Sequence, residues 1–311
     1  MSQEKIQGLA LAMVETGPKP LQPGDRLWVV APSGVLQERQ AFEQGIALWR
    51  AQGYHIKLAS GYDQGWGYLA GSDRHRQHQL EEALADPGCR GILCARGGYG
   101  GARLLEGWRW PALATQHHPW LIGFSDSTSL LWSGMAQGLA GIHGPLLTTL
   151  AQEPDWSLQR LFDGVAGKPF APLSGQGWGK GSASGPLLPA NLTVATHMLG
   201  TAHQPNLSGA ILAFEDVSEA PYRLDRMLTQ WRMTGSLEQV AGIALGRFSR
   251  CDPPPNRPSF TVEEVLRDRL GNLEIPVVSG LPFGHDGVNA ALPVGRQARL
   301  DGDRGVLDVI P

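Results

Sequence analysis

The amino-acid sequence predicts an α/β protein made of two α/β domains. The length of 311 residues suits about two domains of ~150 residues each. Short apolar runs alternate with segments of helical period, which is typical of a mostly parallel sheet covered by helices on both faces. A segment rich in Gly, Ser, Lys and Pro at 164–186 separates the two halves, and this composition indicates a linker or a surface crossing.

The first domain is predicted over 24–163, after a proline-containing leader at 1–23. An apolar run at 27–31 is typical of a buried strand, and the helical spacing of the apolar residues in 37–52 predicts an amphipathic helix. The later elements follow the same alternation: a polar helix at 73–85, strands at 91–95 and 120–124, and a helix that contains 130–135.

The second domain is predicted over 187–311 and repeats the alternation of strands and helices. Its most strongly patterned helix, at about 221–234, has Leu224, Met227, Leu228 and Trp231 on one face. The predicted elements are a helix near 191–200, a strand at 210–214, a helix at about 221–234, a strand at 240–247, a helix at 261–271 and a strand at 275–281.

The composition predicts a folded protein that binds neither nucleic acid nor a membrane. Hydrophobic residues make up 42% and charged residues 18% of the chain, so a normal core can form. The net charge is −3, and the chain has no run of basic residues that could bind along a phosphate backbone. Nucleic acid is therefore not a predicted partner. The apolar run at 9–14 is shorter than the ~7–15 residues of a signal segment. No stretch approaches the ~20 apolar residues of a membrane span, so a cytoplasmic protein without membrane attachment is predicted.

The cysteines predict neither a disulfide framework nor a metal site. The chain has three of them, Cys89, Cys94 and Cys251. An odd and sparse set fits a reducing compartment. No Cys or His partner follows at the spacing of zinc ligands, so we expect no metal and no other cofactor.

Three polar segments directly follow predicted strands, where ligands bind in open parallel sheets. They are Gly123–Asp126, Phe214–Val217 and Gly284–Asp286. In the first, Ser125 lies between a strand and a helix, as in a nucleophile elbow that exposes a hydroxyl and aims the next N–H, that of Asp126, at an oxyanion. The second glycine of the usual elbow motif is absent, and a role in capping the helix is the alternative.

The other two segments supply candidates for a base and its carboxylate. Glu215 ends an apolar strand and His285 lies in a turn-rich stretch, so the two could activate a serine hydroxyl. His143 is the competing histidine. Asp216 and Glu219 are the competing carboxylates, and an ion pair with Arg223 or Arg226 would be a structural role for this segment.

The glycine-rich segment Arg96–Gly101 follows the strand at 91–95. Consecutive glycines let backbone N–H groups approach a ligand closely, although a tight turn before a helix would use the same residues. The spacing matches neither a dinucleotide-binding nor a nucleotide phosphate-binding motif.

Taken in order, these motifs resemble those of the LD-carboxypeptidase family of serine peptidases, which includes the microcin C self-immunity peptidases. The resemblance runs from about Gly24 to the C-terminus. The matching segments are Gly24–Arg26, Ala31–Ser33, Tyr68–Gly71, Arg96–Gly100, Gly123–Asp126, His143–Pro145, Glu215–Val217, Pro221–Arg226 and Gly284–His285.

The resemblance implies that Ser125 is the nucleophile, His285 the base and Glu215 the orienting carboxylate. It implies oxyanion donors at the N–H of Asp126 and at one N–H of the Gly97–Gly98 turn. It also implies a Rossmann-like, amidotransferase-like N-terminal domain, a swivelling-type C-terminal domain, a site in the cleft between them and a homodimer.

The implied substrate is a murein tetrapeptide, which loses its terminal D-alanine in peptidoglycan recycling. Such an enzyme must hold the terminal carboxylate, and Arg96 is the predicted side chain for this. One departure from the family is Pro189-Ala190, where two glycines are expected before the helix near 191–200; substrate contacts there are therefore open.

Two other functions remain open at this stage. An immunity-type serine peptidase would cleave aminoacyl-nucleotide toxins with the same catalytic residues. A non-catalytic small-molecule binding protein would use the same scaffold without turnover.

Overall fold

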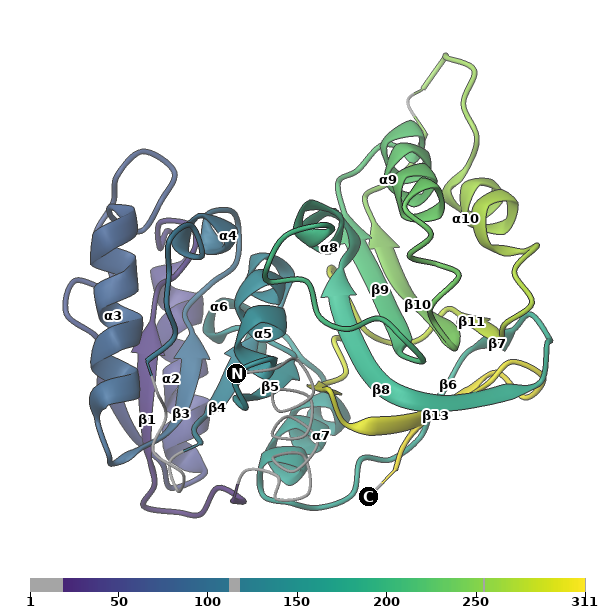
Figure 1. Ribbon diagram of the computed structural model, residues 1–311. Coiled ribbons are helices and arrows are strands. Elements are labelled where there is room, and N and C mark those ends of the chain that lie inside the picture. The colour runs from purple at the N-terminus through teal and green to yellow at the C-terminus, as the bar shows by residue number, and fades with distance from the viewer. Residues whose placement is uncertain (1–18, 112–117, 254, 311) are drawn as a thin grey trace, which may run out of the picture.

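The computed structural model describes residues 19–111, 118–253 and 255–310. Two β-sheets lie side by side, the first built mainly from the N-terminal half and the second from the C-terminal half (Figure 1). The α/β class with a parallel N-terminal sheet is therefore confirmed.

The first sheet has six strands in the order β12-β5-β4-β3-β1-β2. Five of them are parallel, and β12 pairs antiparallel with β5. The order reverses between β1 and β3, and ligands of such sheets bind beyond the carboxyl ends at this point. The strands are β1 (Arg26–Val30), β2 (His55–Leu58), β3 (Cys89–Cys94), β4 (Trp120–Gly123), β5 (Ala140–His143) and β12 (Leu292–Val294).

Helices cover both faces of this sheet because its strands are apolar on both sides. The side chains of α2, α6 and α7 pack on one face, and those of α3, α4 and α5 pack on the other. The helices are α2 (Arg39–Ala51), α3 (Asp73–Ala85), α4 (Gly101–Leu104), α5 (Thr128–Met135), α6 (Leu147–Leu150) and α7 (Asp155–Val165).

The second sheet has eight strands in the order β6-β14-β13-β8-β9-β10-β11-β7. The central strands β8 to β11 are parallel and the outer strands are antiparallel to their neighbours. These strands are β6 (Leu173–Ser174), β7 (Gln176–Gly177), β8 (Ser182–Asn191), β9 (Ile211–Val217), β10 (Gly242–Ser249), β11 (Val277–Ser279), β13 (Gln297–Asp301) and β14 (Val306–Val309).

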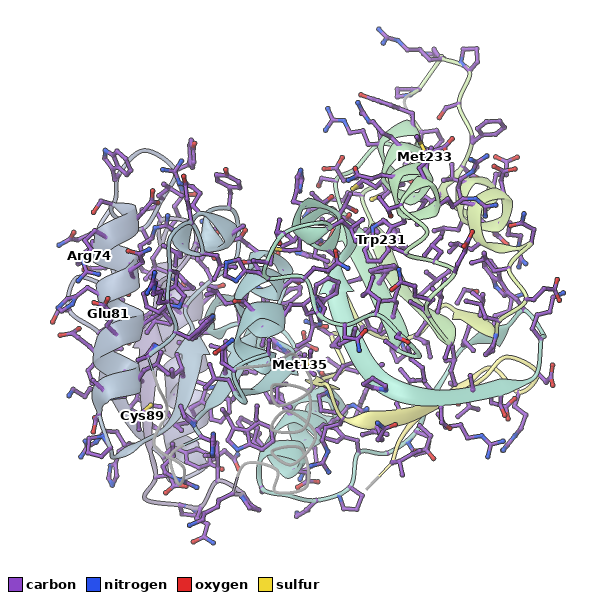
Figure 2. All side chains as sticks on the ribbon, in the orientation of Figure 1. Arg74, Glu81, Cys89, Met135, Trp231 and Met233 are labelled. Carbon is purple, nitrogen blue, oxygen red and sulfur yellow. The ribbon has the colours of Figure 1, made fainter. Side chains whose placement is uncertain are left out.

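Three helices cover one side of the second sheet: α8 (Leu192–Met198), α9 (Pro221–Met233) and α10 (Val262–Leu270). Leu224, Leu228 and Trp231 of the apolar face predicted for α9 are buried and Met227 is partly buried, with the ring of Trp231 packed against Phe214 at 5.1 Å between centroids. Figure 2 shows Trp231 on this inner face, whereas Arg74 and Glu81 form an ion pair on the outer face of α3.

The halves share one continuous hydrophobic core. Helix α5 packs against α8 and β8, and the indole N–H of Trp132 donates to the carbonyl of Pro189 at 3.1 Å. Pro189 and Ala190 stand where the family resemblance implies two glycines. The two residues lie in buried strand β8, paired with β9, and not in a turn that precedes the helix.

The segment 164–186, predicted as a linker or surface crossing, forms strands in the structure. Residues 164–186 contribute β6, β7 and the start of β8 to the second sheet, where their backbones pair with neighbouring strands. Strand β12 returns from the C-terminal half to the first sheet. Of the predicted leader, residues 1–18 lie outside the described residues; Leu21 is buried and donates its N–H to the carbonyl of Val165.

Candidate active site

Ser125 lies in a strained turn directly after β4. Its φ of 61° is in the left-handed region, which L-residues with a side chain rarely adopt. The next residues form a 3₁₀ turn (Ser125–Ser127) that leads into α5. Ser125 is half-buried, whereas Asp126 and Ser127 are buried. The local geometry is therefore that of a nucleophile elbow, which presents the Ser125 hydroxyl at the carboxyl end of the sheet.

The turn at Gly97–Gly101 lies against this serine. A Cβ added at Gly97 would lie 3.1 Å from the Ser125 Oγ, so a side chain there would crowd the hydroxyl. In the described part of the chain, the N–H groups of Gly97 and Gly98 donate to no acceptor. An open N–H at Gly97, which lies against the serine hydroxyl, and a second open N–H at the next residue are suited to bind a negatively charged oxygen.

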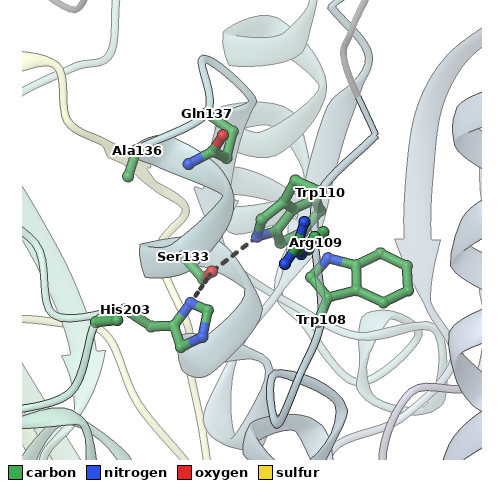
Figure 3. A pocket seen from close by; sticks show the side chains of 8 residues that line it. Trp108, Arg109, Trp110, Ser133, Ala136, Gln137 and His203 are labelled. Carbon is green, nitrogen blue, oxygen red and sulfur yellow. Dashed lines mark hydrogen bonds between the residues drawn. The ribbon is translucent and has the colours of Figure 1, made fainter. Parts of the chain in front are cut away.

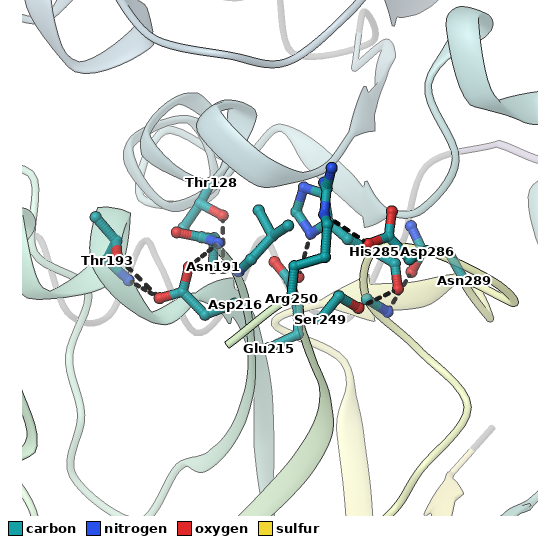
Figure 4. A network of polar contacts seen from close by, with 12 residues as sticks. Thr128, Asn191, Thr193, Glu215, Asp216, Ser249, Arg250, His285, Asp286 and Asn289 are labelled. Carbon is teal, nitrogen blue, oxygen red and sulfur yellow. Dashed lines mark hydrogen bonds and ion pairs between the residues drawn. The ribbon is translucent and has the colours of Figure 1, made fainter. Parts of the chain in front are cut away.

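Glu215 and His285 form a close pair across the carboxyl end of the second sheet (Figure 4). The His285 Nδ1 and the Glu215 Oε2 are 2.6 Å apart, and Glu215 is fully buried near the end of β9. Because a carboxylate only accepts hydrogen bonds, Nδ1 carries the proton and Nε2 keeps its lone pair. This is the tautomer that a general base requires.

The loop around His285 is fixed by its own hydrogen bonds. Ser249 Oγ donates to the carbonyl of His285 at 2.5 Å, and the N–H of Gly284 donates to the Asn289 Oδ1 at 3.0 Å. Gly284 has φ +119°, and a Cβ there would lie 3.0 Å from the Cβ of Glu215. A glycine at this position therefore allows the loop to bring the imidazole onto the carboxylate.

The pKa of His285 is raised above 6.5 although the ring is mostly buried. Burial acts to lower this pKa, but the hydrogen bond and the charge of Glu215 act to raise it, with smaller contributions from Asp216 and Asp286. The net shift shows that the carboxylate stabilises the imidazolium, which a base forms when it takes a proton.

The structure brings the serine and the Glu215–His285 pair together from different sheets. The ring of Phe124, the residue before Ser125, packs on the His285 ring with 4.6 Å between centroids. Within the described residues, Ser125 Oγ and His285 make no direct hydrogen bond. Such bonds are often long without a substrate and shorten in the reacting complex.

The competing histidine, His143, is placed in the interior of the first sheet. It pairs with Gly123 on the neighbouring strand and is fully buried beside Phe124. Burial lowers the pKa of His143 to about 4, against the opposing effect of Glu215. Its ring nitrogens have no hydrogen-bond partner among the described residues.

Arg96 points to a different neighbour than the sequence predicts. Its guanidinium donates to the carbonyl of Val35 at 2.8 Å and lies 3.6 Å from the carboxylate of Glu38. These contacts tie the glycine turn to the 33–38 loop.

Asp216, a competing carboxylate in the sequence, has a separate role. It accepts hydrogen bonds from the Asn191 Nδ2 at 3.0 Å and from the N–H and hydroxyl of Thr193 at 2.9 and 2.8 Å (Figure 4). Burial and then the charge of Glu215 raise the pKa of Asp216 to about 6. Asn191 also donates its N–H to Thr128 at the start of α5, so this network joins the two halves. No sequence motif pointed to Thr128 or Thr193.

A hollow of about 260 Å³ lies at the other end of α5 from Ser125. Figure 3 shows a hydrogen-bond chain there from the Trp110 indole through the Ser133 hydroxyl to His203, at 2.8 and 2.9 Å. These hydrogen bonds join the two halves of the molecule, because His203 belongs to the C-terminal half. Their position separates them from the Ser125 region.

No group of three or more His, Cys, Asp or Glu side chains in residues 19–111, 118–253 and 255–310 is arranged to hold a metal ion. In the same ranges, no helix combines the length and the apolar composition needed to cross a lipid bilayer.

Comparison with known proteins identifies related sequences over nearly the whole chain. The model of the LD-carboxypeptidase N-terminal domain matches residues 28–144, and that of the LD-carboxypeptidase C-terminal domain matches residues 184–300. A Synechocystis sp. protein, provisionally named a carboxypeptidase, is 58% identical over 293 residues, which cover 94% of this chain and 97% of that protein. The murein tetrapeptide carboxypeptidase of Pseudomonas aeruginosa is 32% identical over 302 residues, covering 91% and 95%.

Solved structures share the fold. The muramoyltetrapeptide carboxypeptidase from Oxalobacter formigenes superimposes with a TM-score of 0.82 at 28% identity, over 92% of this chain and 99% of that one. MccF in complex with glutamyl sulfamoyl guanosine gives a TM-score of 0.84 at 19% identity, over 94% and 98%. The second likeness shows a shared fold.

Proposed function

The chain belongs to the LD-carboxypeptidase family, and from this premise we propose that it is a serine carboxypeptidase that removes the terminal D-alanine from murein tetrapeptides. Family membership makes it a carboxypeptidase-type hydrolase. The observation that most supports the serine mechanism is the 2.6 Å Glu215–His285 pair, packed through Phe124 onto the elbow of Ser125.

The first half of the proposed reaction forms an acyl-enzyme. Ser125 Oγ attacks the carbonyl carbon of the bond between the L-centred diamino acid and D-alanine, and its proton passes to the Nε2 of His285. The carbon–nitrogen bond then breaks, and His285 gives this proton to the departing D-alanine amine. The shortened peptide remains as an ester on Ser125.

The second half releases the peptide. A water molecule attacks the ester carbonyl and His285 accepts its proton. The carbon–oxygen bond to Ser125 breaks and the serine regains a proton from His285. In both halves, the N–H groups of Asp126 and the Gly97–Gly98 turn stabilise the oxyanion, and Glu215 stabilises the imidazolium.

The substrate assignment is supported by the relatives. The Pseudomonas aeruginosa and Oxalobacter formigenes proteins are named for murein tetrapeptides and muramoyltetrapeptides, respectively. We extend this substrate class and a role in peptidoglycan recycling to the present chain. On the family resemblance we also propose a cytoplasmic location and a homodimer.

Incubation with L-Ala-γ-D-Glu-(diamino acid)-D-Ala is expected to release free D-alanine, detected by mass spectrometry. The matched control is the same peptide with its terminal carboxylate amidated. We expect the amide to be cleaved much more slowly, because an exopeptidase selects the last bond by holding that carboxylate. Equal rates for both peptides would contradict carboxylate recognition, and cleavage of an aminoacyl-nucleotide in place of both would favour the immunity-type activity.

Activity is expected to survive prolonged dialysis against a strong chelator. The proposed mechanism draws its nucleophile from Ser125 and its oxyanion donors from backbone N–H groups, so every catalytic group is part of the chain. The measurement is the rate of D-alanine release before and after dialysis. A loss of activity that added zinc restores would refute the serine mechanism.

A further inference from the structure

Four charged side chains surround the base of the Gly97–Gly101 turn, and the proposed reaction uses none of them. We call them the turn cluster: Asp73 and Arg76 from α3, Arg103 from α4, and Asp126, which follows Ser125. Two arginines and two aspartates balance in charge. Asp73 joins both arginines, at 2.5 Å to the Arg76 Nη2 and at 2.6 Å to the Arg103 Nη2.

Arg76 binds the Gly100 end of the turn through hydrogen bonds from its guanidinium. It is fully buried, and its Nη1 donates to the carbonyl of Gly100 at 2.9 Å and to the carbonyl of Pro32. Burial lowers the pKa of Arg76, and the neighbouring Asp73 opposes this shift. A buried guanidinium is costly unless its donors are paired, so these contacts fix the positions of both carbonyl groups.

Asp126 holds the same end of the turn from the side of the elbow. Its Oδ2 accepts the N–H of Gly101 at 2.6 Å, and the residue is 3% exposed. A Cβ added at Gly101 would lie 2.9 Å from this oxygen, so the fit requires glycine. The carbonyl of Gly100 and the N–H of Gly101 belong to one peptide unit. Arg76 and Asp126 therefore fix this peptide by both of its polar groups.

The near end of the turn has its own anchor. The N–H of Gly34 donates to the carbonyl of Gly97 at 3.1 Å. The open N–H of Gly98 belongs to the same peptide unit as this carbonyl, and the open N–H of Gly97, the residue that lies against Ser125, is one peptide before it. Glycine backbones have many accessible conformations, so the direction of these N–H groups depends on the anchors.

We propose that Asp126 and Arg76 are positioning residues, whose side chains hold the Gly97–Gly101 turn so that its N–H groups face the oxyanion formed at Ser125. This inference rests on the proposed serine mechanism. A displacement of about 1 Å in a catalytic group can cost roughly 10²-fold in rate, so a rigid peptide at this point has a measurable effect.

Asp126→Ala is expected to lower kcat by about 10²-fold while KM changes little, which is the size of losing one oxyanion donor. The rate at which a fluorophosphonate modifies Ser125 is expected to fall in parallel, because that reaction also develops negative charge on oxygen. Asp126→Asn keeps a carbonyl oxygen for the Gly101 N–H and is expected to recover part of both rates. If Asp126→Ala does not fold, Asp126→Asn provides the test, with both rates expected to lie below those of the wild type.

The matched control is Gln79→Leu, on the same helix as Arg76. Gln79 is fully buried and accepts the N–H of Ala31 at 2.8 Å, so its loss also removes one buried hydrogen bond. We expect a lower melting temperature with kcat unchanged. A wild-type protein that fluorophosphonates do not label would overturn the proposed function and this inference with it. A labelled wild type with equally fast labelling of folded Asp126→Ala and Asp126→Asn would overturn the inference alone.

Discussion

Replacing Ser125 or His285 with alanine is expected to lower kcat by on the order of 10⁴-fold or more, the largest effect of any substitution considered for this chain. A serine hydroxyl is a weak nucleophile until a base removes its proton, and His285, the proposed base, packs on the elbow through Phe124. The double variant is expected to be little worse than either single variant, since each removes the same step. The measurement is kcat for D-alanine release.

Ser127→Ala is the matched control for the elbow. Ser127 is fully buried, and a Cβ added at Gly123 would lie 2.8 Å from its Oγ, so this hydroxyl lies against the sheet and away from the glycine turn. Ser127→Ala should remain active, and both Ser127→Ala and Ser125→Ala should melt at the wild-type temperature. The assignment of Ser125 fails if Ser125→Ala keeps most of its turnover while Ser127→Ala or His143→Ala loses it.

Replacing Glu215 with glutamine is expected to lower kcat strongly, but by less than the loss of the base. The glutamine carbonyl can still accept the Nδ1–H of His285, so the orientation of the ring partly survives. The negative charge that stabilises the imidazolium is lost. Because Glu215 is fully buried, no water molecule can take over this role without a rearrangement of the site.

The same substitution is expected to move the acidic limb of the pH profile. A histidine acts as a base only when it is neutral, so with His285 as the proposed base kcat/KM is expected to rise as the pH increases through its pKa. In the wild type this pKa lies above 6.5, because Glu215 outweighs the effect of burial. In Glu215→Gln the charge that raises the pKa of His285 is gone and burial lowers this pKa, so the acidic limb is expected to shift to lower pH.

An NMR titration of the His285 ring, alongside the rate measurements, assigns this limb. It is needed because Asp216, whose pKa burial and the charge of Glu215 raise to about 6, titrates in the same range. If the ring resonance and the limb stay in place in Glu215→Gln, Glu215 does not set the protonation of His285.

The sequence alone predicted most of the elements near the proposed site. Apolar runs and helical spacing report which residues are buried, and this local information predicted β1, β3, β4, β9 and α9 to within a few residues. Weakly patterned elements were not predicted. Strands β12 to β14 depend on partners far along the chain, and the Gly- and Ser-rich segment 164–186 becomes part of a sheet through backbone pairing.

The order of motifs also predicted a site of Ser125, Glu215 and His285, because each follows a strand that the local apolar pattern predicted. Only the tertiary structure decided their partners. The Glu215–His285 contact spans 70 positions and depends on the loop that Gly284 allows. Arg96 is engaged by Val35, and Asp126 by the N–H of Gly101. A side chain's type and local pattern indicate what it can bind, but which group it meets is determined by strand order and packing between the two sheets.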